Sequence, residues 1–257
     1  MTRIDATFGR LQARGEKALI PFITAGDPDL ATTHTLALTM AAKGADLLEL
    51  GIPFSDPLAD GPTIQAASTR AVKGGVHLPE VLELAGTLRR ETEVPLVLMG
   101  YYNPILQYGL KRTAADAARL GVDGFIIPDL PLEEAGPWRQ AAAREGIATI
   151  FLAAPTSGPG RIKKAGRRTR GFLYYVSVTG ITGARAELPP DLVAALKEVR
   201  SLVKCPLAVG FGIAGPEQAR RVAQVADGVI VGSRIVQLIG QDPGCFIGCT
   251  GNRETID

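Results

Sequence analysis

The sequence predicts an α/β protein with a single (β/α)8 TIM barrel, and three observations support this fold class. The chain has 257 residues, close to the usual length of roughly 250 residues for one such barrel. Eight short apolar segments recur along it as continuous runs, which is typical of strands buried on both faces of a parallel sheet. Helix-start signals lie between these segments, so strand and helix alternate.

The eight expected strands can be given directly as apolar segments. They are residues 18–23, 45–52, 95–100, 124–128, 148–153, 171–178, 206–211 and 228–233. In three of the segments between them, a capping residue or a first-turn proline stands where a helix should begin. These signals are Asp27-Pro28, Thr113 with Asp116, and Gly215-Pro216.

Parallel strands joined by helices can form either a closed barrel or an open doubly wound sheet. An open sheet usually carries a Gly-x-Gly-x-x-Gly phosphate loop after its first strand, but here that strand continues into ITAGDPD. The barrel is therefore favoured. Before the first strand, Ile4, Phe8 and Leu11 have helical spacing, which predicts an extra N-terminal helix on the barrel floor.

The composition excludes several classes of protein. The net charge of +2 is too small to indicate a nucleic-acid partner, and the basic cluster at residues 161–170 has no interleaved aromatic residues, so we interpret it as a solvated helix face. The three cysteines, Cys205, Cys245 and Cys249, have neither a disulfide framework nor a usual zinc spacing, so no metal is expected. No apolar run approaches a membrane span and the start does not resemble a secretory signal, which predicts a cytoplasmic location.

Catalytic residues in this architecture lie at the carboxyl ends of the strands. Glu49 is a carboxylate within the apolar run LLELGI, where alternation points it into the barrel. Burial there would raise its pKa and keep it protonated nearer neutral pH, as a general acid requires. A structural glutamate bound by a buried partner is the alternative.

The loop after Glu49, GIPFSDPLADGPTIQ, is rich in proline and glycine and adds two further acids. Asp60 can reach back over the barrel mouth, and Asp56 is an equal rival from physical reasoning alone. Glycines at the last three strand ends indicate phosphate binding by backbone N–H groups, with Gly212, Gly232 and Ser233 as the candidates, although each glycine alone fits a simple turn.

These motifs resemble the α subunit of tryptophan synthase. The resemblance rests on LELGIPFSDPLADGPTIQAAS together with PFITAGDP, PDLP, SVTGITG and GFGI, and it extends from about Arg3 to about Ile239. It implies cleavage of indole-3-glycerol phosphate to indole and glyceraldehyde 3-phosphate, without a metal or organic cofactor on this subunit. Glu49 then matches the proton-transfer residue. Asp60 matches the carboxylate that binds the indole N–H, and we expect its pKa to be low.

The resemblance also assigns the substrate pocket. It implies an indole site formed by Phe22, Ile126, Tyr174 and Phe211, with Tyr101 and Asp129 nearby. It places a lid after the sixth strand, where Thr182 bonds to the catalytic aspartate and Gly183 contacts phosphate. Ordinary barrel packing is the alternative for the apolar members.

The family's partner is a β subunit that carries pyridoxal phosphate (PLP), and the resemblance implies an α2β2 heterotetramer. Pro53, Asp56 and Pro57 are expected at the contact surface. Two alternatives remain: a lyase that releases indole without a β subunit, and a non-catalytic activating or scaffold subunit. Intact Glu49 and Asp60 argue against the second.

The C-terminus departs from the family. We expect residues 1–243 to form the barrel and residues 244–257 to be an atypical tail, because Gly244, Gly248 and Gly251 each disfavour a helix by about 1 kcal/mol. The family normally has a final amphipathic helix here. We therefore predict weak order after Pro243, and either an unrelated terminus or a barrel wall covered by a partner.

Overall fold

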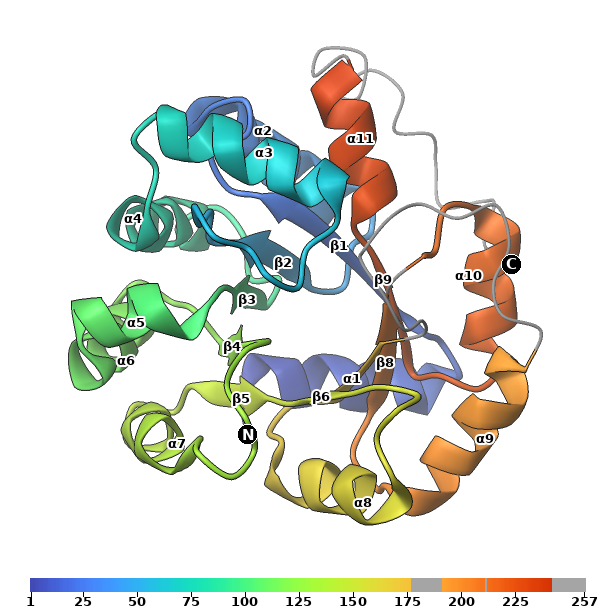
Figure 1. Cartoon of the computed structure of the whole chain (residues 1–257). Helices are drawn as coiled ribbons and strands as arrows, with labels where there is room; N and C mark the ends of the chain where they lie inside the picture. Colours follow the sequence, from blue (N-terminus) through green and yellow to red (C-terminus); the bar gives the residue numbers. More distant parts are fainter. Residues whose placement is uncertain (177–190, 211, 242–257) are drawn as a thin grey trace.

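The computed structural model describes residues 1–176, 191–210 and 212–241, and within them helices surround a ring of parallel strands (Figure 1). The strands are β1 (Ala18–Thr24), β2 (Leu48–Gly51), β3 (Leu96–Met99), β4 (Gly124–Ile126), β5 (Ala148–Ile150), β6 (Leu152–Ala153), β7 (Leu173–Val176), β8 (Leu207–Gly210) and β9 (Gly228–Val231). The helices are α1 (Arg3–Arg14), α2 (Leu30–Ala42), α3 (Pro62–Lys73), α4 (Leu78–Arg89), α5 (Tyr102–Tyr108), α6 (Leu110–Arg119), α7 (Gly136–Arg144), α8 (Pro159–Arg168), α9 (Leu192–Leu202), α10 (Pro216–Ala223) and α11 (Ser233–Gln241).

The sheet closes into a barrel at the fifth predicted strand. The strand order is β5-β4-β3-β2-β1-β9-β8-β7-β6, and its two ends, β5 and β6, are separated in the chain only by Phe151. The prediction of one strand over 148–153 is therefore wrong at this residue. The Phe151 N–H donates to the Thr169 hydroxyl (3.1 Å) instead of to a neighbouring strand, while the Phe151 carbonyl accepts from Tyr174 N–H (3.0 Å).

The other seven strands are confirmed at the predicted places, although residues 177, 178 and 211 of the predicted segments lie outside the described residues. Every pair of neighbouring strands in the ring is parallel. Parallel pairing requires a crossover between consecutive strands, and helices supply it. The predicted TIM barrel is confirmed.

The N-terminal helix α1 is also confirmed, and it closes the floor of the barrel. Ile4, Phe8 and Leu11 are all at most 5% exposed and belong to the apolar cluster that fills the barrel interior. The rings of Phe8 and Phe172 lie 5.7 Å apart. A second, larger cluster packs between the strands and the outer helices, so a buried layer lies on each side of the sheet.

Only one of the three predicted helix starts is correct as stated. Gly215 caps α10 and Pro216 is its first residue. Helix α2 begins later than Asp27-Pro28, because Asp29 is the cap and accepts from Thr32 N–H (2.7 Å). Thr113 is not a cap.

Thr113 lies inside α6, which begins at Leu110. Its hydroxyl donates to the carbonyl of Gly109 (3.0 Å), one turn back, as threonines within helices often do. Asp116 also lies within α6, where its carboxylate accepts from the Tyr108 hydroxyl (2.8 Å). The polar pair that resembled a cap is therefore a set of bonds within and beside one helix.

The expected division at residue 243 cannot be compared with the structure, because residues 242–257 lie outside the described residues. Among the described residues, no helix is long and apolar enough to cross a membrane.

Candidate active site

Glu49 is buried at the centre of the barrel. It lies on β2, where it pairs with Phe22 of β1 and Val97 of β3, so its side chain points inward with theirs. Only 1% of it is exposed, and neither carboxylate oxygen has a hydrogen-bond partner among the described residues. Burial, and secondarily the charge of Asp60, raises the pKa of Glu49 to about 8. The predicted burial and pKa shift are both confirmed.

Asp60 lies in the loop between β2 and α3, immediately before Gly61, which caps α3. The Tyr101 hydroxyl donates to Asp60 Oδ2 (3.0 Å), and the Tyr101 oxygen accepts from the Ala59 N–H (2.9 Å). These two bonds hold the end of the loop against the start of α5. Burial raises the pKa of Asp60 to about 6, although the bond from Tyr101 acts to lower it.

The expected low pKa of Asp60 is therefore wrong. Desolvation of the charged form of Asp60 outweighs the single hydrogen bond from Tyr101. The rival acid, Asp56, is exposed and accepts a bond from the neighbouring Ser55 hydroxyl. Asp56 therefore does not enter the barrel, and the structure separates two acids that physical reasoning on the sequence left equal.

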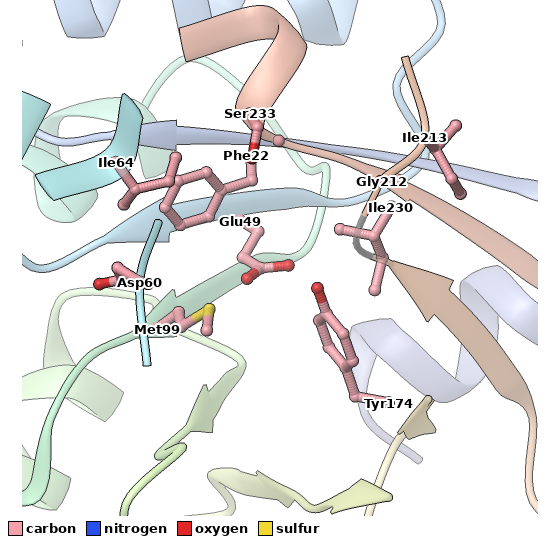
Figure 2. Close-up of a pocket in the computed structure, with 11 residues that line it drawn as sticks. Phe22, Glu49, Asp60, Ile64, Met99, Tyr174, Gly212, Ile213, Ile230 and Ser233 are labelled. Atoms are coloured by element: carbon pink, nitrogen blue, oxygen red, sulfur yellow. The ribbon is translucent and has the colours of Figure 1, made fainter. Parts of the chain in front are cut away.

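Glu49 and Asp60 line one pocket of about 440 Å³, including the part open to solvent. Figure 2 shows Glu49 at its centre, with Tyr174 and Ile230 on one side and Asp60 and Ile64 on the other. Burial and the negative charges of Glu49 and Asp60 raise the pKa of Tyr174, so its hydroxyl keeps its proton. Glu49 and Asp60 therefore line the same pocket together with several apolar side chains.

The two glycines and the serine predicted to bind phosphate line the same pocket. Gly212, Gly232 and Ser233 come from the ends of β8 and β9, and Ser233 is the first residue of α11. A helix N-terminus presents free N–H groups and favours an anion. Gly212 has a φ of 78°, a left-handed conformation that glycine adopts without strain. This end of the pocket is therefore suited to a phosphate group.

Of the remaining predicted residues, not all line the pocket. Phe22 lines the pocket, while Ile126 is fully buried in the barrel interior beneath it. Asp129 is exposed and accepts from the Tyr102 N–H (2.8 Å) at the start of α5. Three predicted residues, Thr182, Gly183 and Phe211, lie outside the described residues.

Among the described residues, four apolar ones that line the pocket were missed by reasoning from the sequence: Ile64, Met99, Ile213 and Ile230. Met99 and Ile230 lie on strands, and strand alternation could have placed them inside. Ile64 enters from α3 and Ile213 follows Gly212, and no local pattern distinguishes either from ordinary core residues.

The residues expected at the partner surface differ in exposure. Pro53 is buried in this chain, and its contact with a partner stays a prediction. Asp56 is exposed, Pro57 is half-buried, and the adjacent Leu58 is 87% exposed. The outward part of the loop therefore begins after Phe54.

Comparison with known proteins gives one family. The family described as tryptophan synthase alpha chain matches residues 8–247. A tryptophan synthase alpha chain of Geotalea uraniireducens (strain Rf4) is 54% identical over 244 residues, covering 95% of this chain and 91% of that protein. One from Geobacter sp. (strain M21) is 55% identical over 237 residues, covering 92% and 89%.

Solved structures agree with this family. Tryptophan synthase subunit alpha from Legionella pneumophila str. Paris has a TM-score of 0.92 at 41% identity, covering 100% of this chain and 99% of that one. A chain of the tryptophan synthase a2b2 complex from Pyrococcus furiosus has a TM-score of 0.86 at 40% identity, covering 93% and 97%. The chain therefore belongs to the tryptophan synthase α chain family and is an enzyme subunit of tryptophan biosynthesis.

Proposed function

We propose that this chain is a carbon–carbon lyase that cleaves indole-3-glycerol phosphate to indole and glyceraldehyde 3-phosphate. The observation that carries the proposal is the pair of acids in one pocket with different pKa values. At pH 7, Glu49, with a pKa of about 8, is largely protonated, whereas Asp60, with a pKa of about 6, is largely ionised. A proton donor and an anion are therefore available together, as this reaction requires.

Glu49 acts as the proton shuttle. Its carboxylic acid donates a proton to C3 of the indole ring, which makes the ring an indoleninium cation. The resulting carboxylate then accepts the proton of the hydroxyl on the carbon bonded to C3. As that hydroxyl becomes the aldehyde, the carbon–carbon bond breaks and its electron pair neutralises the ring. Glu49 ends protonated, and the lack of a fixed hydrogen-bond partner among the described residues leaves it available for both transfers.

Asp60 stabilises the cation. Its carboxylate accepts a hydrogen bond from the indole N–H, and the positive charge that develops on the ring strengthens this interaction in the transition state. The bond from Tyr101 holds Asp60 in place at 3.0 Å. Gly212, Gly232 and Ser233 would bind the phosphate at the other end of the pocket, which fixes the direction of the substrate.

The decisive experiment mixes the purified chain with indole-3-glycerol phosphate and measures indole. We expect indole in stoichiometric amounts with glyceraldehyde 3-phosphate. A folded chain that releases no indole, even in the presence of a tryptophan synthase β subunit, would contradict the assignment. Glu49→Gln serves as the control, because it retains the shape of the side chain but cannot transfer the proton.

We also propose a PLP-dependent β subunit as the partner, in an α2β2 assembly, with the PLP held by that subunit. The similar Pyrococcus furiosus structures include a tryptophan synthase complex, which supports this proposal. The exposed loop residues Asp56 and Leu58 lie only a few residues before Asp60 in the same loop. A partner bound there would contact the segment that positions the catalytic anion, a physical route for coupling. A cytoplasmic location stays a prediction.

A lyase that works without a β subunit is the alternative, and turnover with and without added β subunit separates the two. The scaffold alternative predicts a folded chain with no turnover in either case. The buried, high-pKa Glu49 argues against a scaffold, because keeping an acid without a partner in the barrel core is costly unless it has a task.

A further inference from the structure

A second, smaller compartment adjoins the pocket at Asp60. It shares Phe22, Asp60, Ile64 and Met99 with the main pocket, and its volume is about 300 Å³ including its opening. Its other walls are the ends of β1 to β4 and the inner face of α3. The residues that line this compartment but not the main pocket include Thr24, Ile52, Ser68 and Tyr101.

The hydroxyl of Thr24 is the group in this compartment that could bind a polar ligand atom. It is the last residue of β1, only 3% exposed, and its hydroxyl has no hydrogen-bond partner among the described residues. Buried hydroxyls in folded proteins almost always have a partner, so such an atom beside a substrate pocket indicates a ligand atom or a water that completes it. Ser68, on α3 and 4% exposed, carries a second hydroxyl-bearing side chain that lines the same compartment.

The direction of the substrate follows from the main pocket. The phosphate end is defined by Gly212, Gly232 and Ser233, and Asp60 lies on the opposite side of Glu49 from Tyr174 (Figure 2). With C3 of the indole at Glu49 and the ring nitrogen at Asp60, C7 is the benzene-ring carbon beside the nitrogen, and its substituent lies on the same side as the N–H, next to Asp60. Because Asp60 is a wall of both compartments, C7 is directed toward the smaller one.

We propose that the smaller compartment is a specificity subsite, in which the hydroxyls of Thr24 and Ser68 hydrogen-bond a polar substituent carried at C7 of the indole. This inference rests on the proposed lyase function and adds to it a substrate class, the 7-hydroxylated indoles. With unsubstituted indole, a water molecule takes the place of the substituent. A 7-methyl group fills the same space but leaves the Thr24 hydroxyl without a partner, so the subsite discriminates against it.

The test uses the reverse reaction, the condensation of an indole with glyceraldehyde 3-phosphate, in the full chain with its β subunit. The measured quantity is kcat/KM for 7-hydroxyindole divided by kcat/KM for indole within each variant, so that a general loss of activity cancels. We expect the unaltered chain to prefer 7-hydroxyindole over 7-methylindole. Thr24→Val, which keeps the shape and removes the hydroxyl, should lower the ratio about tenfold, the effect of one net hydrogen bond.

Three controls make the result specific. Thr24→Ser keeps a hydroxyl and should restore the ratio. Thr7→Val removes a buried hydroxyl from α1, on the barrel floor, and should not change the ratio. With 4-hydroxyindole, whose hydroxyl is at the other end of the benzene ring, Thr24→Val should have the same effect as with indole.

Two failures are distinguishable. If the unaltered chain condenses indole but Thr24→Val changes the 7-hydroxyindole ratio by less than twofold, the subsite assignment is wrong and the lyase function stands. If the unaltered chain treats 7-hydroxyindole and 7-methylindole alike, the assignment is also wrong. If the folded chain does not condense indole at all, the proposed lyase function is wrong, and the subsite proposal that rests on it is wrong as well.

Discussion

At the scale of single residues, the pKa values of Glu49 and Asp60 predict a bell-shaped pH dependence of kcat/KM. Below a pH of about 6, Asp60 becomes protonated and can no longer stabilise the cation. Above a pH of about 8, Glu49 loses the proton that it must donate. Activity should therefore be maximal between these two values, as measured by indole release across pH.

The substrate phosphate also titrates near pH 6, so the acidic limb needs a control. In Asp60→Asn, the residual activity should lose the limb that belongs to Asp60. The charge of Asp60 helps to raise the pKa of Glu49, so this variant should also move the alkaline limb to lower pH. An alkaline limb that stays in place would contradict the coupling of the two acids.

Asp60→Asn should nearly abolish cleavage. The amide keeps the size of the side chain but has no charge, and losing such transition-state stabilisation typically costs about 3 kcal/mol, at least a hundredfold in rate. Asp56→Asn is the matched control on the same loop, because Asp56 is exposed and bonds only to Ser55 among the described contacts. Steady-state kinetics of the isolated chain compare the two, and equal losses would mean that the charge of the loop, not Asp60, is what matters.

At the scale of elements, the fit between β7 and β8 shapes the pocket wall. A Cβ added at Gly210 of β8 would collide with the Tyr174 hydroxyl, which comes from β7. Gly210→Ala should therefore displace Tyr174 and lower kcat/KM for cleavage by at least tenfold, because a misplaced wall residue disturbs the position of the substrate.

Gly160 offers the control for this substitution. It lies in α8, and an added Cβ there meets nothing within 4 Å. Gly160→Ala should leave kcat/KM unchanged and raise helix stability by up to about 1 kcal/mol. If both variants lose activity to the same extent, the collision with Tyr174 is not the cause.

Elements also differ in how well their boundaries could be predicted. Gly215-Pro216 was read correctly because capping is a local property of the backbone. Asp27 resembled a cap but instead accepts two bonds from Arg70 of α3, at 2.7 and 2.8 Å. That partner is 43 residues away, and no local pattern announces it.

At the scale of the whole molecule, the barrel closes at the interruption between β5 and β6. Thr169 is 4% exposed there, and its hydroxyl accepts from the Phe151 N–H while donating to the Phe172 carbonyl. Thr169→Val would leave the buried Phe151 N–H unpaired. We expect the free energy of unfolding, measured with urea, to fall by about 1–3 kcal/mol.

Thr35→Val is the comparison, because Thr35 is exposed on α2 and donates only to the carbonyl one turn back. Its effect on the free energy of unfolding should stay within about 0.5 kcal/mol. Thr169→Ser keeps the hydroxyl and should recover most of the loss. A Thr169→Val variant as stable as the unaltered chain would mean that water replaces the hydroxyl at the closure.

The sequence by itself determined the barrel, the N-terminal helix and the burial of Glu49. These follow from the period of apolar residues, which depends on local geometry and on which face of an element is buried. Alternation along β2 was sufficient to direct Glu49 inward before any contact was known. Asp60 was chosen over Asp56 only because the surrounding sequence resembles a known family.

Only the tertiary structure gave a physical reason to choose Asp60 over Asp56, and only it revealed the raised pKa of Asp60 and the compartment around Thr24. Each depends on side chains brought together from distant parts of the chain, such as Tyr101 against Asp60 or Ser68 near Thr24. Desolvation is set by everything that surrounds a group, so no local pattern could have given the direction of the pKa shift of Asp60. The positions of the strands therefore follow from local sequence patterns, whereas the different pKa values of Glu49 and Asp60 follow from tertiary packing.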